Sequence, residues 1–141
     1  CDSNALQSCS QQQVINTYDN TIAYTDHILA SMISAVAQDE RYSSALLYVS
    51  DHGESTGEHG LYLHGAPYVF APSQQTHVPM LSWLSSDFAA RQPARAACLQ
   101  QRHADALSHD NIFHSLLGLA SVKTQVYVPA LDITAGCSGQ T

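Results

Sequence analysis

Basic residues and long apolar segments are both scarce in this chain of 141 residues. Lysine and arginine together number only 5, against 12 acidic residues, and the formal net charge is -7. Because the few cations are scattered, the sequence offers no basic patch for phosphate backbones, which argues against a nucleic-acid partner. No run approaches the roughly 18–20 apolar residues of a membrane-spanning helix. We therefore expect one acidic globular unit with a core of its own.

The cysteines lack the Cys-x-x-Cys spacing of a zinc finger. A zinc site, disulfides and buried thiols all stay open for them. Cys1 and Cys9 enclose a short polar loop that a disulfide would close. We predict this pair, which implies an oxidising compartment. Cys98 and Cys137 are less informative, since they either pair with each other or stay buried as free thiols.

Hydrophobic periodicity predicts a helix and two strands in the first part of the chain. Apolar residues recur at helical spacing over 14–37 and predict one long amphipathic helix. The apolar run 45–49 is typical of a buried parallel strand that is covered on both faces. Residues 78–84 predict a second strand. Between the two strands, residues 54–75 are rich in Gly and Pro and predict a long loop.

The remaining part of the chain predicts mainly helix. A helix broken at Pro93 is expected over 87–102. Ser108 is expected to cap a further helix that ends near Gly118 or Ser121. Residues 125–141 indicate no element. Helices that alternate with apolar strands place the chain in the α/β class.

Asp51 and His52 directly follow the predicted strand, at the edge of an α/β sheet where ligands usually bind. Neighbouring side chains on a strand point to opposite faces, so both reach one metal only where the chain bends. Gly53 permits this bend. Carboxylate and imidazole groups are both zinc ligands, so the pair predicts half of a metal site. A simple cap at the end of the strand is the alternative.

Further donors follow in the predicted loop. His64 stands between apolar residues and Gly65, and it either faces the site or is a satisfied, partly buried histidine. Glu54 and Glu58 lie four residues apart and are expected to share a solvated helical surface. Thr56 is a lone threonine, and no partner in the sequence makes it a nucleophile.

Several longer motifs are similar to those of one enzyme family. They are Ser50–Ser55, Gly57-Glu58, Tyr62–Gly65, Pro67-Tyr68, Phe70–Pro72, Gln75–Met80, Ser108–Asn111, Phe113-His114, and Tyr18–Thr21 with Tyr24–Asp26 upstream. In this order they resemble the lipid A phosphoethanolamine transferases, which include the mobile colistin-resistance enzymes. The resemblance runs from Cys1 to about Cys137 and includes the loop between Cys1 and Cys9.

The resemblance implies a fold and a site. The fold would be part of an α/β/α sandwich like that of alkaline phosphatases and sulfatases, with residues 1–141 as the carboxy-terminal portion of a single catalytic domain. A zinc ion would be held by Asp51 and His52 together with a Glu and the nucleophilic Thr. His64 would lie by the substrate phosphoryl group or by an additional zinc. His59 stands where close relatives commonly have Asn.

The implied activity is zinc-dependent transfer of phosphoethanolamine from phosphatidylethanolamine to lipid A phosphate, which gives resistance to cationic peptides such as colistin. It would take place at the periplasmic face of the bacterial inner membrane. The family's nucleophilic Thr and Glu ligand come from segments before the one that matches Cys1. We therefore assign no catalytic nucleophile here, and expect the isolated chain to be inactive without the upstream part of the domain, which also carries the membrane segments. A phosphatase or sulfatase of the same superfamily and an inactive fragment are the alternatives.

Overall fold

The computed structural model describes residues 1–137, which form two compact units. The first unit contains Cys1–Gln38 and Tyr48–Leu81, and the second contains Asp39–Leu47 and the chain from Ser82 onward. Helices and strands are both present, and the predicted α/β class is confirmed. The assignment of residues 1–141 to a single catalytic domain stays a prediction.

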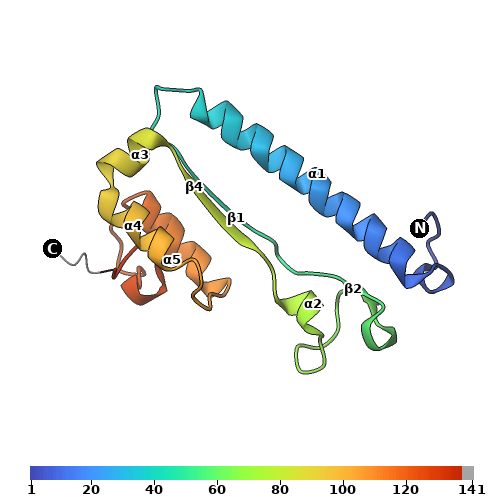
Figure 1. The fold of residues 1–141 in the computed structure, drawn as a ribbon. Helices are drawn as coiled ribbons and strands as arrows, with labels where there is room; N and C mark the ends of the chain where they lie inside the picture. The colour runs from blue at the N-terminus through green and yellow to red at the C-terminus, as the bar shows by residue number, and fades with distance from the viewer. Residues whose placement is uncertain (138–141) are drawn as a thin grey trace. The chain divides into compact units, whose positions relative to one another are not determined.

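One long helix, α1 (Gln11–Ala37), accounts for much of the first unit (Figure 1). The predicted helix is confirmed, and it begins three residues earlier than expected because Ser10 caps it. The Ser10 side chain accepts a hydrogen bond from the Gln13 N–H, and the Gln13 side chain accepts one from the Ser10 N–H. Val14 is the buried residue of this helix. The other apolar side chains of α1 therefore stay at least partly exposed in the described chain.

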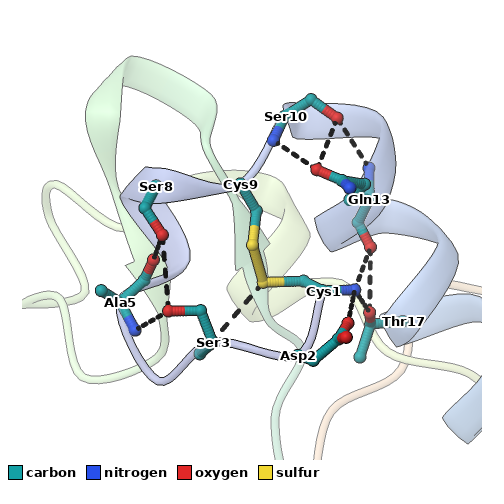
Figure 2. Close-up of a disulfide and its surroundings, with 9 residues drawn as sticks. All are labelled: Cys1, Asp2, Ser3, Ala5, Ser8, Cys9, Ser10, Gln13 and Thr17. Carbon is teal, nitrogen blue, oxygen red and sulfur yellow. Dashed lines mark hydrogen bonds and ion pairs between the residues drawn. A yellow bond between two sulfur atoms is a disulfide. The ribbon is translucent and has the colours of Figure 1, made fainter.

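A disulfide between Cys1 and Cys9 closes the loop that leads into α1 (Figure 2). The two Cα atoms are 6.0 Å apart, and a single 3-10 turn at Leu6–Ser8 lies inside the loop. The predicted pair is thus confirmed. Because the disulfide ends one residue before the Ser10 cap, it fixes the chain where α1 begins.

Two five-residue strands, β1 (Ala45–Val49) and β4 (Met80–Leu84), pair into one sheet. Both strands were predicted, but the parallel, fully buried environment of β1 was not found. The Ser50 N–H donates to the Pro79 carbonyl and the Ser85 N–H to the Ser44 carbonyl, so the pair is antiparallel. Ala45 is exposed and the rest of β1 is half-buried. Within residues 1–137, the strand pairs with β4, and none of its residues is fully buried.

The predicted long loop contains a hairpin. Strands β2 (Ser55–Thr56) and β3 (Tyr62–Leu63) pair antiparallel, with Ser55 opposite Leu63. A 3-10 turn at Glu58–Gly60 joins them. Gly57 and Gly60 both have positive φ, which glycine adopts at little cost. A short helix, α2 (Ser73–Thr76), then precedes β4.

Three helices form the second unit: α3 (Ser86–Arg91), α4 (Pro93–Gln101) and α5 (Asp110–Leu119). The predicted break at Pro93 is confirmed. A 3-10 turn, Pro129–Leu131, follows in the tail, where the sequence indicated no element. A second disulfide joins Cys98 of α4 to Cys137, with 5.1 Å between the Cα atoms, which decides between the two alternatives that the sequence left open.

Buried polar groups anchor the tail of the second unit. Asp132 is fully buried, and its carboxylate accepts hydrogen bonds from the Tyr127 hydroxyl and from the N–H and hydroxyl of Thr134. The Arg95 guanidinium lies 3.6 Å from the same carboxylate. A Cβ at position 118 would collide with Asp132, so Gly118 of α5 is needed for this approach. Among residues 1–137, no helix has the length and apolar character to cross a membrane.

Candidate active site

The chain leaves β1 at Ser50 and bends through Asp51, His52 and Gly53. Gly53 is held close to the segment that precedes β4. Its N–H donates to the Gln75 carbonyl over 3.0 Å, and a Cβ at this position would collide with the Gln74 carbonyl oxygen. Glycine is therefore required here by the close approach of another backbone segment. This approach fixes the bend that carries the two predicted ligands.

Asp51 and His52 bring two donor atoms to the same side of the bend. The His52 Nδ1–H donates to the Gly53 carbonyl over 3.1 Å, so Nε2 keeps its lone pair. Asp51 Oδ1 accepts from the His52 N–H, and Oδ2 lies 3.6 Å from His52 Nε2. Two atoms that bind one tetrahedral zinc lie roughly 3.3–3.6 Å apart. The spacing of this pair therefore fits two ligands of one zinc ion.

His64 and Glu54 lie beside this pair. The His52 and His64 ring centroids are 4.0 Å apart, and His64 Nδ1 lies 2.8 Å from Glu54 Oε1. Three donor atoms lie within 4.8 Å of one another, one each from His52, Glu54 and His64. Two imidazoles and a carboxylate are the donor types that zinc prefers. Among the described residues, the structure thus groups the predicted His52 and His64 with Glu54, while Asp51 contacts His52 but is not part of this group.

The solvated surface predicted for Glu54 and Glu58 is not found, because Glu54 precedes β2, Glu58 begins the 3-10 turn, and both are half-buried. The Glu54 side chain is only 25% exposed. Glu58 accepts hydrogen bonds from the N–H and the hydroxyl of Thr56, at 2.7 and 2.9 Å. Burial raises the pKa of Glu58, but these bonds and those from nearby backbone groups outweigh it and lower the pKa overall. Thr56 therefore holds the hairpin turn together.

A cavity of about 400 Å³ opens beside the site within the first unit. Its lining includes residues of α1, the end of β1 and the hairpin, among them Asp51, His52 and Glu54. Tyr18 of α1 contributes its ring to this lining. Burial and the negative charge of Glu54 raise the pKa of Tyr18. The α1 side of the cavity thus combines apolar side chains with threonines, and the other side carries acidic and imidazole groups.

Sequence reasoning missed the contacts that join the hairpin to the chain before β4. Gln75 is buried, and its amide nitrogen donates to the Ser55 hydroxyl over 2.8 Å. Its amide oxygen accepts from the Ala66 N–H. These bonds link Ser55, which follows Glu54, to Ala66, which lies two residues after His64. The pair Gly57 and Gly60 is the sequence signal that would have indicated the turn.

Residues 1–122 match the family model named Sulfatase, and the chain belongs to this family. Among curated relatives, phosphoethanolamine transferase EptA of Salmonella typhimurium is 49% identical over 139 residues. This match covers 97% of the chain and 25% of the relative. Phosphatidylethanolamine transferase Mcr-2 of Escherichia coli is 42% identical over 137 residues, which is 96% of the chain and 22% of the relative.

A solved structure gives the same result. The crystal structure of the C-terminal periplasmic domain of phosphoethanolamine transferase EptC from Campylobacter jejuni matches with a TM-score of 0.87 and 44% identity. The match covers 96% of the chain and 42% of that domain. The resemblance to phosphoethanolamine transferases is therefore confirmed. The chain spans about a quarter of the length of the curated relatives it matches.

Proposed function

We propose that this chain is part of a zinc-dependent enzyme that transfers phosphoethanolamine from phosphatidylethanolamine to a lipid A phosphate. The observation that carries the proposal is the pair at the bend, with 3.6 Å between Asp51 Oδ2 and His52 Nε2 and with the His64 ring 4.0 Å from the His52 ring. The names of the relatives support the transferred group, and the name of Mcr-2 supports the lipid donor. The match to the periplasmic domain of EptC supports a periplasmic location.

Asp51 and His52 would hold the zinc ion. A bound zinc ion would supply positive charge that activates a hydroxyl and stabilises negative charge on phosphate oxygens. His52 is prepared for this role because its Nδ1–H is engaged by the Gly53 carbonyl, which fixes the ring and directs the lone pair of Nε2. His64 would contact the phosphoryl group from the hairpin. Val14 and Ile22 in the lining of the cavity would contact the apolar part of a lipid substrate.

Two ligands complete only half of a tetrahedral zinc site. The Asp51 side chain is 87% exposed, so residues 1–137 leave this side of the site open. We infer that a Glu and the nucleophilic Thr from the upstream part of the domain fill it, as the resemblance implies. The isolated chain would then bind zinc weakly and transfer nothing. Transfer would take place at the periplasmic face of the inner membrane, and the modified lipid A would bind cationic peptides such as colistin less tightly because it carries less negative charge.

The test is to incubate the whole native protein with zinc, phosphatidylethanolamine labelled in its head group, and lipid A. A transferase should produce labelled lipid A. A phosphatase or sulfatase would either release the label into solution or leave it on the phosphatidylethanolamine. Asp51→Asn and His52→Gln should abolish transfer and lower the zinc content. His103→Gln is a matched control, because His103 hydrogen-bonds the Gln100 carbonyl in the second unit. Full transfer by both site variants would overturn the proposal. Transfer by the isolated 141-residue chain would show that the predicted inactivity of this chain is wrong.

A further inference from the structure

Glu54 and His64 are cross-strand neighbours. In the hairpin, Ser55 pairs with Leu63 and Thr56 with Tyr62, so Glu54 and His64 occupy the next position along the two chains. Residues that lie opposite each other in an antiparallel pair project from the same face. At this end of the hairpin, Glu54 Oε1 lies 2.8 Å from His64 Nδ1.

This contact determines which nitrogen of His64 carries the proton. An ionised carboxylate can only accept a hydrogen bond, so Nδ1 must donate. The neutral ring then carries its lone pair on Nε2, where it can accept a hydrogen bond or bind a cation. Without the Glu54 carboxylate, the neutral ring would be free to adopt the other tautomer.

The two glutamates of the hairpin differ in how their oxygens are satisfied. Both carboxylate oxygens of Glu58 accept hydrogen bonds from Thr56. Glu54 Oε2 is buried and has no hydrogen-bond partner among residues 1–137. A buried acceptor without a partner is costly and calls for an explanation. The Glu58 carboxylate therefore holds the turn, whereas Glu54 Oε1 contacts His64 Nδ1 at 2.8 Å and lies 4.0 Å from His52 Nδ1.

The backbone before His64 is also constrained. Leu63 has φ 62, a left-handed conformation that side chains other than glycine and asparagine rarely adopt. Such conformations persist where the surrounding structure enforces them, and they occur often at functional sites. The next residue is His64, whose ring centroid lies 4.0 Å from that of His52. The position of the His64 ring is thus set by its backbone and by Glu54.

We propose that Glu54 is a positioning residue that holds His64 in the tautomer with its lone pair on Nε2, beside the His52 ring. The inference rests on the proposed function, and it assigns to Glu54 a role through His64 and not a place among the zinc ligands. Loss of the carboxylate should lower kcat by about 10- to 100-fold, as for other residues that orient a ligand or catalytic group. KM and zinc content should change little.

The experiment compares Glu54→Ala and Glu54→Gln in the whole native protein, with Glu58→Gln as a matched control in the same hairpin. Ring-labelled ¹⁵N-histidine spectra report the tautomer, and the His64 signal is the one lost in His64→Gln. Wild type should show a protonated Nδ1, which Glu54→Ala should lose and Glu54→Gln should largely keep, because the amide oxygen still accepts. Glu58→Gln should lower thermal stability but leave kcat within about twofold of wild type.

An unchanged His64 tautomer in Glu54→Ala would overturn the proposal, and so would a loss of kcat no larger than in Glu58→Gln. Loss of zinc from Glu54→Ala would make Glu54 a metal ligand and would overturn it as well. If Glu54→Ala does not fold, Glu54→Asp replaces it, since the shorter side chain withdraws the carboxylate from Nδ1. If wild type transfers no phosphoethanolamine, the proposed function fails, but the tautomer spectra still decide the role of Glu54.

Discussion

Replacing Asp132 by asparagine should be among the most destabilising changes in the second unit. The Asp132 carboxylate is fully buried, accepts three hydrogen bonds from Tyr127 and Thr134, and lies 3.6 Å from the Arg95 guanidinium. An amide keeps the shape but offers one acceptor oxygen and no charge. Removing one partner of a buried ion pair costs about 3–5 kcal/mol. Because the Arg95 side chain is 24% exposed, we expect a loss of about 3 kcal/mol.

The assay is urea unfolding of wild type and Asp132→Asn in the longest native form of the protein that folds. Asp105→Asn is the matched control, since Asp105 is more than half exposed and lies 3.8 Å from Arg102. Exposed pairs of this kind contribute about 0–1 kcal/mol. The hydrogen bond to Asp132, burial and the charge of Asp132 together raise the pKa of Tyr127. Asp132→Asn should therefore also lower the pKa of Tyr127. Equal losses of stability in Asp132→Asn and Asp105→Asn would refute the reasoning.

Three further changes test other parts of the structure. His59→Asn should raise the free energy of unfolding by about 1 kcal/mol, because His59 has φ 53 and asparagine tolerates the left-handed conformation better; a loss on urea unfolding would contradict this. Cys98→Ser opens a loop with a sequence separation of 39 and should cost about 4 kcal/mol in the chain-entropy model, and a denaturation midpoint equal to that of the oxidised wild type would contradict it. Glu58 has a lowered folded pKa, so its stabilisation is complete above its ordinary value of 4.5 and is lost as pH falls through the folded value. Glu58→Gln should remove this acid dependence of stability. Equal profiles of stability against pH for the variant and wild type would contradict the role of Glu58.

Much of the helical structure could be predicted from the sequence because its signals are local. The 3.6-residue period of α1 and the break at Pro93 depend on residues close in sequence, and both were correct. The hairpin was missed because each of its strands has only two residues, which is too short for an alternating pattern. The burial of β1 was overestimated because burial depends on the segments that cover a strand, which its own apolar residues do not reveal.

The candidate site also contains residues that the sequence indicated and contacts that it did not. Asp51, His52 and His64 were found from the sequence because they stand in recognisable motifs. Glu54 was assigned to a solvated surface because four-residue spacing was taken to indicate a helix. Its contact with His64 spans ten residues across the hairpin, so only the structure reveals it. The same holds for the bond between Gln75 and Ser55, which spans twenty residues.

The role of Asp51 and His52 as zinc ligands is tested most directly by anomalous diffraction. Crystals of the whole native protein, grown with zinc, would be measured on both sides of the zinc absorption edge. We predict an anomalous peak within bonding distance of both His52 Nε2 and an Asp51 carboxylate oxygen, and none at this place in Asp51→Asn crystals. A zinc peak held by His52, Glu54 and His64 without Asp51, or no peak at this bend, would contradict the account.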